Sequence, residues 1–176
     1  MSPEEKVRQL VLAHELQRWT STLANTVQSE ARELKQHLEA RESAPHLTQV
    51  RGLANALAPL GAEDSPERRL ARLHELVAGQ LQRRGQRIPS PMLRMGVPPD
   101  SFWVYVAGRL AALRSGDQQE PGEVEKFWAL LQERYGGLWP AEPDAATGAR
   151  VHLRLAEAFV YHLVETWEYS GREAIS

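Results

Sequence analysis

Apolar residues recur along this chain at steps of three and four, the spacing that places them on one face of an α-helix. The capping pair Ser2 and Glu5, with Pro3 between them, precedes the longest stripe and predicts a helix that runs to about Arg41. At about 1.5 Å per residue it would be roughly 58 Å long, more than a small bundle covers, so we expect a kink near Asn25 or an end packed on another molecule. The stripe consists of Leu12, Leu16, Trp19, Leu23, Val27, Ala31, Leu34 and Leu38.

Five shorter apolar stripes follow, and their boundaries are prolines, glycines or capping residues. The helices they predict begin at Pro45, Ser65, Asp100, Pro121 and about Asp144. Between the third and fourth predicted helices, residues 86–99 contain four prolines and are predicted to form an irregular loop. Helices explain every periodic segment better than strands do. We predict an all-α fold, a single-domain bundle of about six helices over residues 1–176 with a long N-terminal helix.

Composition narrows the class of protein. Hydrophobic residues make up 42% of the chain and charged residues 25%, which is typical of a globular protein. The absence of cysteine excludes a disulfide scaffold, a thiolate zinc site and a cysteine nucleophile. No apolar run approaches the roughly 18 residues of a membrane helix, and the acidic start does not resemble a signal peptide. We expect a cytoplasmic protein with no membrane partner.

The formal net charge of −2 conceals an uneven distribution. Residues 66–94 hold seven arginines and two glutamates, a balance of +5, whereas residues 117–176 hold 5 basic and 11 acidic side chains, a balance of −6. All but three of the 21 basic residues are arginine, whose guanidinium binds phosphate through two hydrogen bonds. This asymmetry indicates an anionic partner for the middle of the chain and a basic neighbour for its end.

The arginines of the third predicted helix share one face. Arg68, Arg72 and Arg83 are separated by 4 and 11 residues, and Arg87 would extend the line by 4 more, just past Gly85. Clustered arginines on one face can contact a nucleic-acid backbone without reading its sequence. These four residues are therefore predicted to bind nucleic acid. The alternative is a solvated helix that pairs with the acidic C-terminal third of the chain.

Motifs for catalysis and metal binding are nearly absent. There is no glycine-rich phosphate loop, no GxSxG, no HExxH and no Glu-x-x-His pair. We expect no enzymatic activity, no metal and no cofactor. One exception is Arg69-Leu-Ala-Arg-Leu-His74, which resembles the R-x(4–6)-H signature of HEPN ribonucleases, an all-α family. That resemblance implies that Arg69 holds a scissile phosphate while His74 moves a proton, although the family places its motif nearer the end of the domain.

Three short patterns, taken in order, resemble a second family. Residues 46–55 (HLTQVRGLAN) are similar to the leucine-threonine-threonine-x-glutamine-x-arginine stretch in the small subunit of Csm-type (type III) CRISPR effector complexes. Residues 102–109 (FWVYVAGR) resemble that family's Tyr-x-x-Gly/Ala-Arg helix, and residues 154–162 (RLAEAFVYH) resemble its terminal Glu-Ala-x-x-x-Tyr-His helix. Together they cover about a quarter of the chain. The long first helix, the extra arginine-rich helix, a missing threonine and a terminal match one residue short depart from the family.

The resemblance, which extends to the related small subunits of other class 1 complexes, implies a non-catalytic helical subunit of an RNA-guided antiviral complex. Such a subunit stacks head to tail on copies of itself and on other effector subunits, along a guide RNA–target duplex or single-stranded nucleic acid. Arg51 and Arg109 match the family's arginines and would contact the backbone. They could instead pair internally with carboxylates such as Glu157 or Glu165 of the acidic last helices.

A third class of function stays open, a helical scaffold or adaptor protein with no role in nucleic-acid binding. Aromatic residues dominate the binding energy of many protein–protein interfaces. Near chain turns this sequence places three of them, Trp139, Trp167 and Tyr169, which could be exposed anchors or part of the core.

Overall fold

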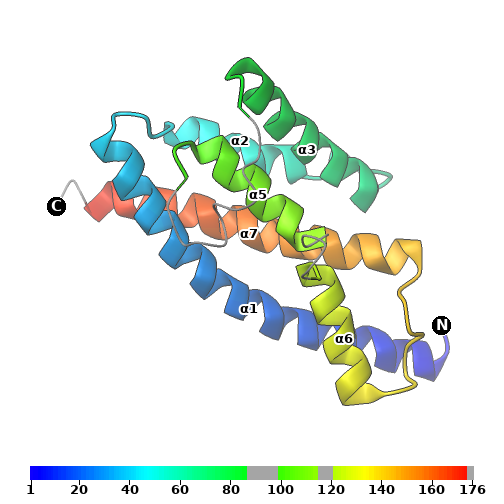
Figure 1. Ribbon diagram of the computed structural model, residues 1–176. Helices are drawn as coiled ribbons and strands as arrows, with labels where there is room; N and C mark the ends of the chain where they lie inside the picture. Colours follow the sequence, from blue (N-terminus) through cyan, green and yellow to red (C-terminus); the bar gives the residue numbers. More distant parts are fainter. Residues whose placement is uncertain (87–98, 115–120, 174–176) are drawn as a thin grey trace.

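The computed structural model describes residues 1–86, 99–114 and 121–173, the side chains of 170–173 excepted, and it is all helical over these ranges (Figure 1). The predicted all-α class, the six helices and the long first helix are therefore confirmed for the described residues. Most of the predicted proline-rich loop, residues 87–98, lies outside them. The helices are α1 (Pro3–Ala40), α2 (Leu47–Leu57), α3 (Pro66–Arg83), α5 (Phe102–Arg114), α6 (Glu123–Tyr135) and α7 (Ala145–Glu173).

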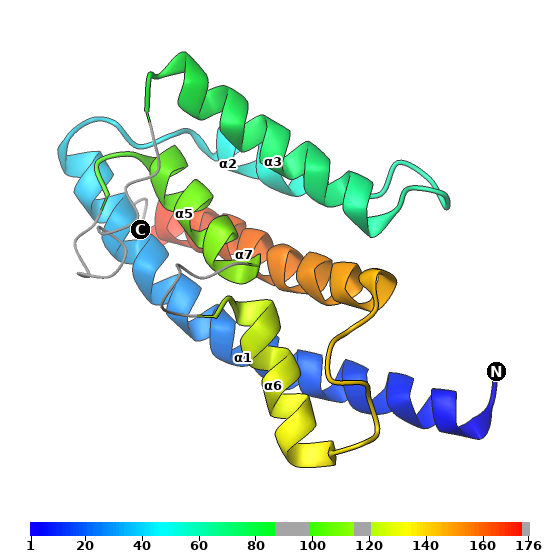
Figure 2. The same cartoon turned by 45° about the vertical axis from the view of Figure 1, so that its right-hand side comes forward.

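The two longest helices, α1 and α7, lie side by side and form the base of the bundle (Figures 1 and 2). They run in the same direction, and near their C-terminal ends the Lys35 ammonium donates to the backbone oxygen of Trp167 at 3.1 Å. Helices α2 and α3 pack on each other and on α7, while α6 lies against α1, α5 and α7. A single hydrophobic cluster includes buried residues from all six helices.

The long helix α1 begins as its capping pair predicts. The Ser2 hydroxyl accepts from the backbone of Glu5 at 3.2 Å, and the Glu5 carboxylate accepts from the backbone of Ser2 at 3.0 Å. The helix then continues from Pro3 through the region of the expected kink to its end. Its first turns extend past the other helices in Figure 2, and Val7 and Leu10 are 49% and 72% exposed.

Helix α5 is buried on all of its sides over its first two turns. A stripe of Trp103, Val106, Leu110 and Leu113 predicted one apolar face, but the structure buries every residue from Phe102 to Gly108. Helices α3, α6 and α7 pack around it, and the Tyr105 hydroxyl donates to Glu30 of α1 at 3.3 Å. A helix without a polar face is typical of the centre of a protein. Even so, no helix in the described part of the chain combines the length and the apolar character needed to cross a membrane.

Three predicted helix starts are wrong, and one of them is Pro121, two residues before α6 begins at Glu123. Asp100 does not cap α5, which begins at Phe102, because its carboxylate accepts instead from Arg41 at 2.7 Å and lies 3.8 Å from His37. Helix α2 begins after His46 rather than at Pro45, whose carbonyl accepts from the indole of Trp167 at 3.1 Å.

The three aromatic residues considered as exposed anchors are placed differently from one another. Trp139 and Trp167 are 8% and 3% exposed and belong to the core. Tyr169 is 54% exposed near the end of α7. Of the three, only Tyr169 can therefore contact a partner with its ring.

The packing of α1 predicts that alanine substitutions at two of its leucines have very different effects on the free energy of unfolding. Leu34 is 1% exposed within the core, whereas Leu10 lies in the projecting first turns. We expect Leu34→Ala to lower the free energy of unfolding by about 2–5 kcal/mol, because it leaves a cavity in the core. Leu10→Ala should change it by less than about 0.5 kcal/mol, as at an exposed site. Urea unfolding followed by circular dichroism measures both, and equal effects would contradict the described packing of α1.

Candidate nucleic-acid interface

Arg51, predicted to contact a nucleic-acid backbone, forms an ion pair within the protein. It lies on α2, and its guanidinium donates from Nε to Glu168 of α7 at 2.9 Å, with a second, shorter contact to the same carboxylate. The partner helix is the acidic last helix expected for internal pairing, although the carboxylate is neither Glu157 nor Glu165. The side chain of Arg51 remains 54% exposed, so one edge of it faces solvent.

Arg72 holds the turn between α2 and α3. Its guanidinium donates to Asp64 at 2.9 Å and to the backbone oxygens of Ala56 and Ala58 at 3.2 and 3.1 Å. The hydrogen bond from Arg72, with one from the backbone of Leu60, lowers the pKa of Asp64 to about 2. All of these partners belong to the end of α2 or the turn that follows it. Arg72 therefore satisfies carbonyls that the helix leaves unpaired at its end.

Arg109 joins α5 to α1. Its guanidinium forms an ion pair with Glu30, which also accepts from the hydroxyl of Tyr105. Burial lowers the pKa of Arg109, and the nearby Glu123 opposes that shift. The partner of Arg109 is thus on the first helix rather than on one of the last helices.

The remaining predicted arginines lie on or after α3. Arg68 and Arg83 are exposed, and neither makes an ion pair among the described residues. Arg87 lies outside the described residues. Of the six predicted residues, the structure therefore leaves Arg68 and Arg83 open on α3 and engages Arg51, Arg72 and Arg109 in ion pairs on three different helices.

The two residues of the HEPN-like pattern have different neighbours. Arg69 donates to the backbone oxygen of Leu57 at 2.7 Å and lies 3.7 Å from Glu157 of α7. His74 lies opposite His152, with 6.1 Å between the ring centroids. Among the described residues, Arg69 is thus engaged by the end of α2 and by α7, and His74 lies beside a second histidine.

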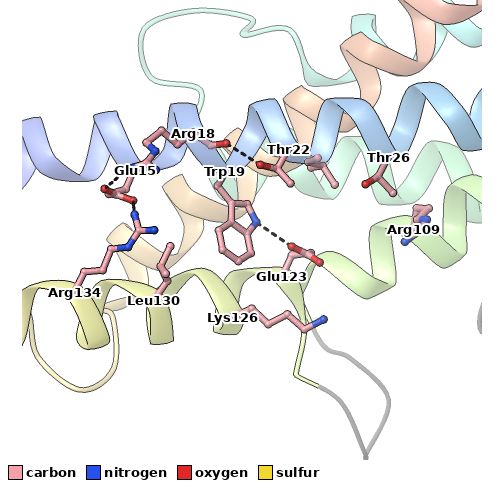
Figure 3. A pocket seen from close by; sticks show the side chains of 11 residues that line it. Glu15, Arg18, Trp19, Thr22, Thr26, Arg109, Glu123, Lys126, Leu130 and Arg134 are labelled. Atoms are coloured by element: carbon pink, nitrogen blue, oxygen red, sulfur yellow. Dashed lines mark hydrogen bonds and ion pairs between the residues drawn. The ribbon is translucent and has the colours of Figure 1, made fainter.

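A cavity of about 520 Å³ lies between the middle of α1 and α6, with Arg109 of α5 beside it (Figure 3). We call it the α1–α6 cavity. Four cationic side chains, two carboxylates, a tryptophan and two threonines contribute to its walls. It is lined by Glu15, Arg18, Trp19, Thr22, Leu23, Thr26, Arg109, Glu123, Lys126, Leu130 and Arg134.

The buried carboxylate of Glu15 links α1 to α6 by hydrogen bonds beside the α1–α6 cavity. Glu15 is 2% exposed and accepts from Arg134 and from the Tyr135 hydroxyl of α6, both at 2.8 Å. The hydrogen bond between Tyr135 and Glu15 raises the pKa of Tyr135. Further along α1, towards Thr26 and Arg109, the indole of Trp19 donates to Glu123 at 2.9 Å (Figure 3). Both carboxylates are thus occupied by groups of the protein, which reduces their repulsion of an anion in the cavity.

The cations of the α1–α6 cavity differ in solvent exposure and in whether a carboxylate pairs with them. Lys126 is exposed and has no ion pair among the described residues, and Arg18 is 59% exposed with its nearest carboxylate 3.8 Å away. Arg134 is 41% exposed although it pairs with Glu15. Sequence reasoning missed all three, because each is an isolated basic residue on the polar face of its helix. Arg109 is the one predicted residue that lines this cavity.

Comparison with family models, with curated proteins and with solved structures gave no match. Within the described ranges, no three histidine or acidic side chains converge as metal ligands would. The candidate site, the α1–α6 cavity, is therefore described from its geometry alone. It lies between two helices and is lined by exposed cations and an indole.

The ion pair of Arg72 predicts a pH-dependent stability. Because the pKa of Asp64 falls from 3.8 to about 2 on folding, its carboxylate stabilises the fold above about pH 4, and this contribution is lost as the pH falls towards 2. We expect Asp64→Asn to lower the urea midpoint at neutral pH and to differ little from wild type near pH 2. The matched control is Glu63→Gln, an exposed neighbour. A deficit of Asp64→Asn that is the same at both pH values would contradict this role.

Proposed function

We propose that this protein binds the sugar-phosphate backbone of nucleic acid without cleaving it, and that the backbone lies in the α1–α6 cavity. The observation that carries the proposal is a set of three solvent-exposed cations around one cavity of about 520 Å³: Lys126, which is unpaired among the described residues, and Arg18 and Arg134, which share the single carboxylate of Glu15. Phosphates dominate the affinity of proteins for nucleic acid, and they bind cations on exposed surfaces.

The other groups of the cavity suit the same ligand. The hydroxyl of Thr26 on α1 can donate to phosphate or sugar oxygens, whereas that of Thr22, one helical turn before it, donates to the backbone oxygen of Arg18 at 3.3 Å. Trp19 is partly buried, with its edge packed on Phe127 at 5.8 Å between centroids, and an aromatic side chain in a cationic groove can stack on an unpaired base. None of these groups reads base identity, so the proposed binding is independent of sequence.

The finer proposal is a small subunit of an RNA-guided antiviral complex. It is supported by the order of the three patterns that resemble the Csm-type small subunit, at residues 46–55, 102–109 and 154–162. In this role the protein would act in the cytoplasm on a guide RNA–target duplex, beside other effector subunits and copies of itself. Arg68 and Arg83, open on α3, would give a second contact to the backbone.

Charge neutralisation in the cavity should weaken binding. We expect the double variant Arg18→Gln/Lys126→Gln to bind a single-stranded RNA of about 20 nucleotides about tenfold more weakly at about 50 mM salt. Each lost phosphate contact should also reduce the slope of log affinity against log salt by about 0.7 on a single strand. Fluorescence anisotropy at several salt concentrations measures both quantities. The loss should be equal for RNAs of different sequence, because phosphates carry no sequence information.

The matched control is Arg32→Gln/Arg154→Gln, which removes the same charge from exposed positions outside the cavity. A second pair, Arg68→Gln/Arg83→Gln, tests the contribution of α3. An equal loss of affinity in the control pair would show that overall charge, and not the cavity, drives binding. Wild-type protein that does not bind RNA or a guide–target duplex at low salt, alone or in the assembled complex, would overturn the proposal.

The same RNA should remain intact on incubation with the protein. Arg69 is held by Glu157 and the carbonyl of Leu57, so it is not available to hold a scissile phosphate beside His74. We expect no cleavage above background on a denaturing gel, for wild type and His74→Ala alike. Cleavage that disappears in His74→Ala, with an unchanged circular dichroism spectrum, would instead favour the ribonuclease.

A further inference from the structure

A second cavity, of about 500 Å³, lies on a different part of the bundle, where α3, the end of α5 and the start of α7 meet. We call it the histidine cavity, because His74 of α3 and His152 of α7 face each other in its wall with 6.1 Å between ring centroids. Its volume is in the range of small-molecule sites. The lining residues are Glu67, Leu70, Ala71, His74, Arg114, Val124, Pro143, Asp144, Ala145, Gly148, Ala149 and His152.

His152 is buried without a partner for one of its ring nitrogens. It is 5% exposed, and its Nε2 has no hydrogen-bond partner among the described residues. Buried polar groups of folded proteins nearly always have a partner in the protein, in solvent or in a ligand. Because the ring lines an open cavity, a molecule inside that cavity can supply the partner.

Arg114 makes this part of the cavity electropositive. It is exposed at the end of α5 and pairs with no carboxylate in the described ranges. Its charge acts on both rings. The pKa of His74 is lowered by burial and then by Arg114, and that of His152 falls to about 4 through burial, His74 and Arg114. Without a ligand both imidazoles are therefore neutral at pH 7.

Of the two carboxylates that line the histidine cavity, one is hydrogen-bonded within the protein and the other is placed two turns along α3 from His74. Asp144 accepts from the backbone of Thr147 at 2.7 Å, so it caps the first turn of α7, and its hydrogen bonds lower its pKa. Glu67 belongs to the first turn of α3, seven residues before His74, about 10 Å along the helix axis. The α6 wall contributes only Val124. The charged and titratable groups nearest to the rings are thus each other and Arg114.

We infer that the histidine cavity binds a phosphate group, held by Arg114 and by the protonated rings of His74 and His152. Each ring nitrogen donates over about 2.8 Å, so one oxyanion between the rings can accept from both. Arg114 supplies the permanent charge, and the apolar wall of Leu70, Ala71, Val124 and Ala149 accommodates the group that carries the phosphate. The phosphate belongs either to a mononucleotide or to the 5′ end of a strand. This inference is independent of the α1–α6 cavity.

Binding should strengthen as the pH falls. A bound anion favours the charged imidazole, so it raises the pKa of both histidines, and protonation must accompany binding at neutral pH. A phosphate ester titrates near pH 6, whereas sulfate keeps its charge, so sulfate separates the titration of the protein from that of the ligand. We expect sulfate to bind at least tenfold more tightly at about pH 5.5 than at about pH 8.

The direct measurement is histidine side-chain NMR of the full chain, titrated with inorganic phosphate, with AMP and with a short RNA carrying a 5′-phosphate or a 5′-hydroxyl. We expect phosphate and AMP to move the ring signals of His74 and His152 and to raise their pKa values, while the remaining histidines do not respond. AMP that binds more tightly than the phosphorylated RNA identifies a mononucleotide as the ligand, and the reverse order identifies a strand end. Both results support a phosphate site.

The key variant is Arg114→Gln, because Arg114 is exposed and its replacement leaves the core intact. We expect it to weaken phosphate binding about tenfold and to raise the pKa of both histidines in the free protein. His74→Gln should weaken binding similarly, and Arg154→Gln, an exposed arginine of α7 outside the cavity, should not. Gly148→Leu should block binding by filling the cavity from α7, where the nearest atoms to an added Cβ lie 3.7 Å away on Pro143.

Two results would overturn the inference. One is the absence of any shift of the His74 and His152 signals at millimolar phosphate and acid pH. The other is binding that Arg114→Gln, His74→Gln and Gly148→Leu leave unchanged. If the hydroxyl-ended RNA shifts both histidines as strongly as the phosphorylated RNA does, the terminal phosphate is not recognised and the inference fails as well.

Discussion

The arrangement of the bundle depends on the burial of α5 on all of its sides. Because this helix has no polar face over its first seven residues, it is stable only when other helices enclose it. Its two arginines emerge where the enclosure ends, Arg109 in the α1–α6 cavity and Arg114 in the histidine cavity. On α6, Glu123 lines the α1–α6 cavity, and the next residue, Val124, lines the histidine cavity. Both candidate sites thus arise at the edges of one enclosed helix.

Internal ion pairs account for part of the uneven charge along the chain. Arg51 and Arg69, from the first half, pair with Glu168 and Glu157 in the acidic last helix. These pairs are partly exposed, and such pairs contribute little to stability, so they fix geometry more than they stabilise it. Among the arginines without such partners in the described residues are Arg68, Arg83 and Arg114, whose charge remains for a ligand.

Local signals were sufficient to predict the helices and insufficient to predict the sites. The Ser2–Glu5 cap and the spacing of the α1 stripe act within a few residues, so the sequence alone contains them. The role of Asp100 was misread because its partner Arg41 is 59 residues away, and a nearby helix start offered a local explanation. His74 and His152 are 78 positions apart, and periodicity cannot say which faces meet. A signal for Glu15 was present, since it lies three residues after Leu12 and four before Trp19 and therefore falls on the apolar stripe.

The projecting end of α1 divides that helix into two parts of different local stability. Its first ten residues have few tertiary contacts, and an isolated helix of that length is marginal in water. The Ser2 cap and the Glu4–Arg8 pair, 3.2 Å apart, add only small increments. Backbone amides before about Leu12 therefore exchange with solvent through fraying of the helix end. Those after Leu16 are protected by the whole bundle, and their exchange reports its global unfolding.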